Sequence, residues 1–101
     1  MTTTVPTQAL TLLNDEFVLV QSRYFAERVK QIGANPDEQI ESAYRIALSR
    51  NPSSKELVES RAFVEKQRSY HAAKGAADPA MTALTDLCNV MFNLNEFIYV
   101  Q

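Results

Sequence analysis

The sequence has little of what interrupts a helix. Its 101 residues include two glycines, four prolines and no tryptophan. Glycine and proline are the residues that most often end a helix, so the long segments between them are free of stop signals. No segment alternates apolar and polar residues over the length of a strand. These absences exclude a sheet-based fold and predict an all-α fold class.

Cysteine and long apolar runs are also scarce. The only cysteine is Cys88, which excludes an intramolecular disulfide and a cysteine-rich metal cluster within the chain. No apolar run approaches the roughly 20 residues of a membrane span. The opening stretch, MTTTVPTQAL, has neither the basic nor the apolar region of an export signal. We therefore expect no membrane span and no targeting signal in this chain.

The chain lacks an excess of positive charge. It has 10 Lys and Arg against 12 Asp and Glu, a net charge of −2. Nucleic-acid-binding domains usually concentrate positive charge on one face, so we predict no nucleic-acid partner. A weaker alternative is that the two predicted helices on either side of SRNPSSKE, residues 49–56, bind DNA.

The length of the chain suits one compact core, so we expect residues 1–101 to form a single helical domain. A domain of this size leaves a large part of its surface exposed. We therefore expect it to pack against domains of a parent chain or against a protein partner. The sequence leaves the oligomeric state open.

Capping residues and apolar spacing predict an irregular bundle of four main helices after a short N-terminal helical turn. The turn follows Pro6 and ends near Asn14. The first main helix covers about residues 16–32, and Gly33 ends it as a C-cap. Its apolar face is expected to contain Phe17, Val18, Val20, Tyr24, Phe25, Val29 and Ile32.

Two further helix starts have clear sequence signals. Asn35 is placed to cap a helix that opens with Pro36 and closes near Arg50. Ser53 and Glu56 then form a capping box, S-x-x-E, at the start of the next helix. That helix is expected to turn these side chains inward: Leu57, Phe63, Val64 and Tyr70.

The last helix is expected to begin near Ala80. Its predicted apolar side contains Met81, Leu84, Leu87, Cys88, Met91 and Ile98. Its other side contains Asp86, Asn89, Asn93 and Glu96, which are expected to face solvent. Asn95 does not fit this division, since it lies four residues after Met91 on the apolar side.

Motifs of known chemistry are lacking. The chain has no Gly-rich phosphate loop, GxSxG or HExxH, so we predict no catalytic, cofactor-binding or metal-binding residues in it. A single histidine is too few ligands for a metal ion. We therefore interpret His71 as a surface residue at the negative end of a helix dipole. It has no CxxCH motif beside it to hold haem. Cys88 is interpreted as a small core residue.

Four polar residues remain, at the predicted helix ends: Asn14, Arg50, Asn95 and Glu96. Buried polar groups at such ends normally satisfy unpaired backbone donors and acceptors. We interpret the four as a structural polar lock that caps and braces the bundle, with Arg50 as its cationic partner. The alternative is a surface binding role.

Three blocks carry a resemblance to a known family: TTTVPTQALTLLNDEFV (2–18), AYRIALSRNPSSKEL (43–57) and ALTDLCNVMFNLNEFIYV (83–100). Together they resemble the closing segment of a planctomycete family of large exported proteins. In that family a cytochrome c domain is often joined to two domains of unknown function. The chain is similar to the C-terminal part of the last of these domains.

The resemblance implies a non-enzymatic structural or interaction module that completes a larger exported protein. It implies a periplasmic or cell-surface location, and haem c elsewhere in the parent protein but no cofactor in this chain. The alternative is a part of a redox or hydrolytic enzyme whose catalytic or haem-binding portion lies upstream.

Overall fold

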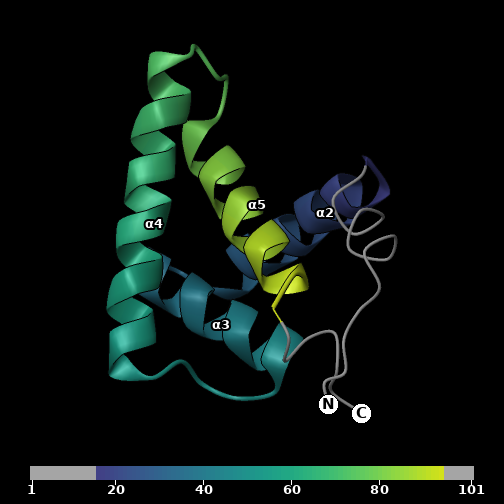
Figure 1. Ribbon diagram of the computed structural model, residues 1–101, viewed down its shortest axis with the longest axis vertical. Helices are drawn as coiled ribbons and strands as arrows, with labels where there is room; N and C mark the ends of the chain where they lie inside the picture. The colour runs from purple at the N-terminus through teal and green to yellow at the C-terminus, as the bar shows by residue number, and fades with distance from the viewer. Residues whose placement is uncertain (1–15, 95–101) are drawn as a thin grey trace.

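The computed structural model describes residues 16–94, and this part of the chain is all-α, as predicted. Its helices are α2 (Glu16–Ile32), α3 (Pro36–Leu48), α4 (Ser54–Ala73) and α5 (Pro79–Phe92). In Figure 1, α4 and α5 are antiparallel neighbours joined by a short connection, with α3 crossing near their lower ends and α2 behind α5. The helical turn predicted before Asn14 lies outside the described residues.

The predicted caps define the starts of α3 and α4. The side chain of Asn35 accepts a hydrogen bond from the Glu38 amide at 3.0 Å, and Pro36 opens α3. The Ser53 hydroxyl accepts from the Glu56 amide at 3.1 Å, while the Glu56 carboxylate accepts from the Ser53 amide at 2.8 Å. These bonds satisfy amides that a helix start leaves unpaired, so both predicted starts are confirmed.

The two helix ends next to α3, its own and that of α2, have physical causes other than those predicted. The helix ends at Leu48, before Arg50, because Ser49 adopts the left-handed conformation with φ 60° and ψ 29°. Gly33 ends α2 as predicted, but a glycine is needed there because α3 leaves no room for a side chain. A Cβ atom at Gly33 would lie 2.7 Å from the backbone nitrogen of Gln39. The glycine therefore allows the first turn of α3 to pack directly against the end of α2.

The last helix is shorter than predicted. It ends at Phe92, not beyond Asn93, and Asn93 follows as the C-cap. The side-chain amide of Asn93 donates to the carbonyl of Asn89 at 2.8 Å. Asn89 was expected to face solvent, but it is half-buried. The amide of Asn93 thus bonds to the carbonyl that the last turn leaves open.

The core lies mainly between α2, α3 and α5. It contains Ala26, Val29, Ile40, Ala43, Tyr44, Leu48, Met81, Leu84, Leu87, Cys88 and Met91. Cys88 is fully buried on α5, which confirms its role as a small core residue. Burial of the remaining apolar side chains on one face of α5 explains why this helix is central to the fold.

The buried face of α2 is turned relative to the predicted one. Four residues of the predicted face are exposed: Phe17, Val20, Tyr24 and Ile32. Apolar side chains occupy consecutive positions at 17–20, so their spacing does not define a single face. Ser22 is buried between the apolar residues because its hydroxyl donates to the Val18 carbonyl at 2.8 Å.

Helix α4 contributes little to the core. Ser60 is its only buried residue, and Leu57, Phe63 and Val64 pack half-buried against the core. Tyr70, predicted to point inward, is 54% exposed and instead lies edge-on against the His71 ring. Polar contacts must therefore help to position α4.

Candidate functional site

A cleft with a volume of about 530 Å³ lies between the first turn of α3, the middle of α4 and the first turn of α5. Its floor is apolar and is formed by Ile40, Val64 and Leu84. Ile40 and Leu84 are 1% and 4% exposed, since they also belong to the core. Each wall comes from a different helix, so the cleft exists only when the three helices are packed.

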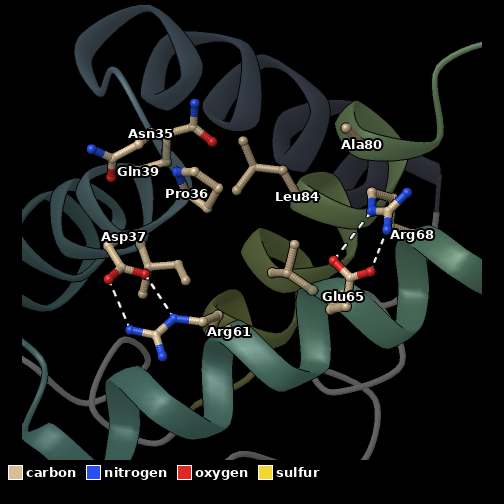
Figure 2. Close-up of a pocket in the computed structure, with 11 residues that line it drawn as sticks. Asn35, Pro36, Asp37, Gln39, Arg61, Glu65, Arg68, Ala80 and Leu84 are labelled. Atoms are coloured by element: carbon tan, nitrogen blue, oxygen red, sulfur yellow. Dashed lines mark hydrogen bonds and ion pairs between the residues drawn. The ribbon is translucent and has the colours of Figure 1, made fainter.

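The rim of the cleft is formed by two ion pairs (Figure 2). Arg61 of α4 donates through Nε and Nη2 to the two carboxylate oxygens of Asp37 on α3, at 2.9 and 2.8 Å. Arg68 donates through the same two nitrogens to Glu65, one turn earlier on α4. The first pair crosses from one helix to the other, whereas the second stays within α4.

These contacts hold the rim acids in their charged forms. The hydrogen bond from Arg61 lowers the pKa of Asp37, and that from Arg68 lowers the pKa of Glu65. Both pairs are exposed to solvent, where ion pairs contribute little to folding stability. The rim is thus charged at neutral pH, and its ion pairs can rearrange with little loss of folding stability.

Hydrogen-bonding capacity on the rim is left mainly on the arginines. A guanidinium has five N–H donors, and each rim arginine uses Nε and Nη2 on its carboxylate. Within residues 16–94, nothing bonds to the Nη1 of Arg61 or Arg68. Both oxygens of Asp37 and of Glu65 already accept a hydrogen bond.

Arg50 lies away from the cleft, at the corner between α3 and α4. Its Nη1 and Nη2 donate to the Glu56 carboxylate at 2.7 and 2.9 Å, and its guanidinium lies 5.5 Å from the centre of the Tyr44 ring. The Tyr44 hydroxyl is 3.3 Å from the Ser60 hydroxyl. Together these contacts join the start of α4 to α3.

The predicted polar lock therefore stays a prediction. Of its members, Arg50 is described, while Asn14, Asn95 and Glu96 lie outside the described residues. The pairing of Arg50 with Glu56 was not predicted from the sequence. The capping box could have indicated this pairing, because it fixes the Glu56 side chain at the start of α4.

A second polar cluster joins the end of α4 to the middle of α5. The Nε2 of His71 lies 2.6 Å from the Oδ2 of Asp86, and the Gln67 side-chain amide donates to the same oxygen at 2.9 Å. His71 lies in the last turn of α4, as expected, but its side chain is 21% exposed. Asp86, predicted to face solvent, is half-buried because α4 covers it.

Residues 16–94 contain neither a haem-attachment motif nor a cluster of metal-ligating side chains. The single cysteine is buried, and burial raises the pKa of the Cys88 thiol from 9.0 to about 12. Among residues 16–94, no three His, Cys, Asp or Glu side chains gather closely enough to hold a metal ion. In the same part of the chain, no helix is long and apolar enough to cross a membrane.

One family model matches the chain, over residues 1–64: PSD1, a protein of unknown function (DUF1553). The match includes the α3 side of the cleft and reaches Arg61 and Val64 on α4. It contains the resembling blocks at 2–18 and 43–57, whereas the block at 83–100 lies beyond it. Neither a search of curated proteins nor one of solved structures found a match.

Proposed function

The chain belongs to the PSD1 family of proteins of unknown function, and we propose that it is a helical interaction module whose cleft holds a segment of polypeptide. In this proposal it completes the C-terminal part of a larger exported protein, with the haem of a cytochrome c domain elsewhere in that protein. The resemblance of its three sequence blocks to the planctomycete family supports this place in a larger exported protein. The segment belongs either to the parent chain or to a protein partner.

The observation that carries the proposal is the composition of the cleft. An apolar floor surrounded by a few polar groups is the usual design of a binding site, and about 530 Å³ is within the range of such sites. The floor offers burial to an apolar side chain. The rim offers hydrogen bonds to the polar backbone on either side of that side chain.

Peptide selection tests the proposal. Random peptides displayed on phage are selected on the immobilised 101-residue chain after depletion on the variant Ala80→Leu. Ala80 is an exposed residue on the cleft wall, so leucine there reduces the cleft without entering the core. Ala62→Leu, on the exposed surface of α4 outside the cleft, is the matched control.

We expect peptides that bind the wild type and Ala62→Leu but not Ala80→Leu. Peptides that bind all three proteins equally, or no enrichment after repeated rounds, would sink the proposed function. Circular dichroism of both variants shows whether they fold.

The contact between His71 and Asp86 favours a second candidate, a contribution to a hydrolytic site. A carboxylate that holds an imidazole is the usual support of a general base. If this cluster takes part in hydrolysis, the chain should cleave p-nitrophenyl butyrate faster than His71→Asn does. Equal rates would rule the candidate out for the isolated chain.

A further inference from the structure

We propose that the polypeptide segment held in the cleft is extended and acidic, with an aliphatic side chain on the floor and carboxylates that reach Arg61 and Arg68. This inference rests on the proposed function and specifies its partner. Three features of the cleft support it: the apolar floor, the unused donors of the rim and the spacing of the two arginines.

The floor selects the side chain. Ile40, Val64 and Leu84 are aliphatic, and none of the described residues that line the cleft is aromatic or has a hydroxyl group. A leucine or isoleucine side chain would exchange water contact for contact with all three. Burying such a side chain favours binding because it removes apolar surface from water.

The rim selects the charge. Within residues 16–94, Asp37 and Glu65 each use two of about four acceptor sites, while Arg61 and Arg68 each use two of five N–H donors and keep Nη1 available. Asn35 adds a side-chain amide whose oxygen is already occupied by the Glu38 amide. The rim is therefore richer in available donors than in acceptors, although its formal charge is balanced. Carboxylates are the strongest acceptors for guanidinium groups.

The spacing of the arginines selects the shape of the segment. Arg61 and Arg68 are seven positions apart on α4, a separation of about 10 Å along a helix axis. Three residues of polypeptide in the extended polyproline II conformation span about the same distance, and its three residues per turn bring positions three apart to one face. Acidic residues three positions apart, with the aliphatic residue between them, therefore match the two arginines and the floor.

The existing ion pairs do not prevent this binding. The side chains of Arg61 and Asp37 are 50% and 44% exposed, and those of Arg68 and Glu65 are similarly accessible. Such exposed pairs contribute little to folding stability. Each arginine can donate through Nη1 to a second carboxylate while it keeps the first, or exchange one carboxylate for the other.

Four short peptides test the inference by NMR titration of the uniformly ¹⁵N-labelled 101-residue chain. The probe is acetyl-Glu-Leu-Ala-Glu-amide. The three comparison peptides replace both Glu by Gln, both Glu by Lys, or Leu by Ala. A fifth titration with hexanoate separates a peptide from a free aliphatic carboxylate.

We expect the Glu-Leu peptide to shift amide signals of the three helices around the cleft and to bind about tenfold more tightly than the Gln and Ala versions. Equal binding of the Gln version would overturn the acidic segment and leave the peptide-binding function standing. Tighter binding of the Lys version, or stronger binding of hexanoate than of any peptide, would also overturn it. If no peptide shifts the cleft signals, the acidic segment is wrong, and the display selection decides separately on the function.

Charge variants give a second test. Replacing Arg61 and Arg68 together by Gln should weaken the Glu-Leu peptide about tenfold and leave the Gln version unchanged. The double variant Arg23→Gln/Arg28→Gln, at two exposed arginines on α2, removes the same charge. It is the matched control and should bind like the wild type. An equal loss in the control would show that net charge alone, and not the rim, attracts the peptide.

Discussion

Arg50 donates to both carboxylate oxygens of Glu56 across the corner where α3 ends and α4 begins, at 2.7 and 2.9 Å. The same carboxylate accepts from the Ser53 amide. One acid therefore closes the capping box of α4 and fixes the preceding connection. Because α4 forms a wall of the cleft and buries little apolar surface, this corner helps to set the position of that wall.

The Glu56 carboxylate should make stability depend on pH in the acid range. The bond from Arg50, and next that from the Ser53 amide, lower the pKa of Glu56 from 4.5 to about 2. A lowered folded-state pKa stabilises the protein above the unfolded value, and the gain disappears as pH falls from about 4.5 to about 2. Since Glu56 is 33% exposed, we expect a gain of about 1 kcal/mol.

The measurement is the free energy of unfolding in urea for the wild type and Glu56→Gln across this pH range. Gln keeps the capping geometry, so the variant isolates the charge. The difference in the free energy of unfolding between the two proteins should be largest at neutral pH and near zero at pH 2. A difference that does not change with pH would contradict the assignment.

The cluster of His71 and Asp86 should be coupled energetically. Asp86→Ala removes the acceptor for both His71 and Gln67, and leaving half-buried groups unpaired should cost about 1 to 3 kcal/mol. A double-mutant cycle with His71→Ala measures the pairwise part. We expect the double variant to lose less than the sum of the two single losses. Strict additivity would mean that the contact does not stabilise α4 on α5.

The thiol of Cys88 should be unreactive in the folded protein. It is fully buried, and its pKa of about 12 leaves little thiolate at neutral pH. Reaction with Ellman's reagent should therefore follow the rate of unfolding and become fast only in denaturant. Immediate reaction under native conditions would show that α5 is not packed as described.

Substitutions at two residues with positive φ, Ser49 and Gly75, should change the stability of the domain in opposite directions. Ser49 has φ 60° at the end of α3, a conformation that glycine adopts without strain. Ser49→Gly should stabilise the domain by up to about 1 kcal/mol. Gly75 has φ 83°, so Gly75→Ala should destabilise it by about 1 kcal/mol although no atom lies near its added Cβ. Thermal unfolding of the two variants checks both signs, and equal midpoints would refute this interpretation.

The helices were predictable because their signals are local. Asn35 and Ser53 cap within three residues of themselves, so their spacing in sequence fixes the bond. The orientation of α2 was not predictable. Its apolar residues surround the helix at 17–20, and contact with α3 and α5, which lie far along the chain, selects the buried face.

The cleft could be inferred from the sequence only in part. Glu65 and Arg68 are three positions apart on one helix, and such pairs can be recognised from spacing. Asp37 and Arg61 are 24 positions apart, and nothing local connects them. Their meeting depends on how α4 packs across α3, and the burial of Asp86 depends on how α4 packs on α5. The polar lock of Asn14, Arg50, Asn95 and Glu96 stays a prediction.

The central claim is that the cleft holds an aliphatic side chain of a polypeptide segment. Intermolecular NOEs test it most directly, between the leucine methyl groups of a display-selected or Glu-Leu peptide and the labelled methyl groups of the 101-residue chain. We predict NOEs to Ile40, Val64 and Leu84, and their loss in Ala80→Leu. NOEs instead to the exposed residues Phe17 and Tyr24 of α2 would place binding on another surface and contradict the claim.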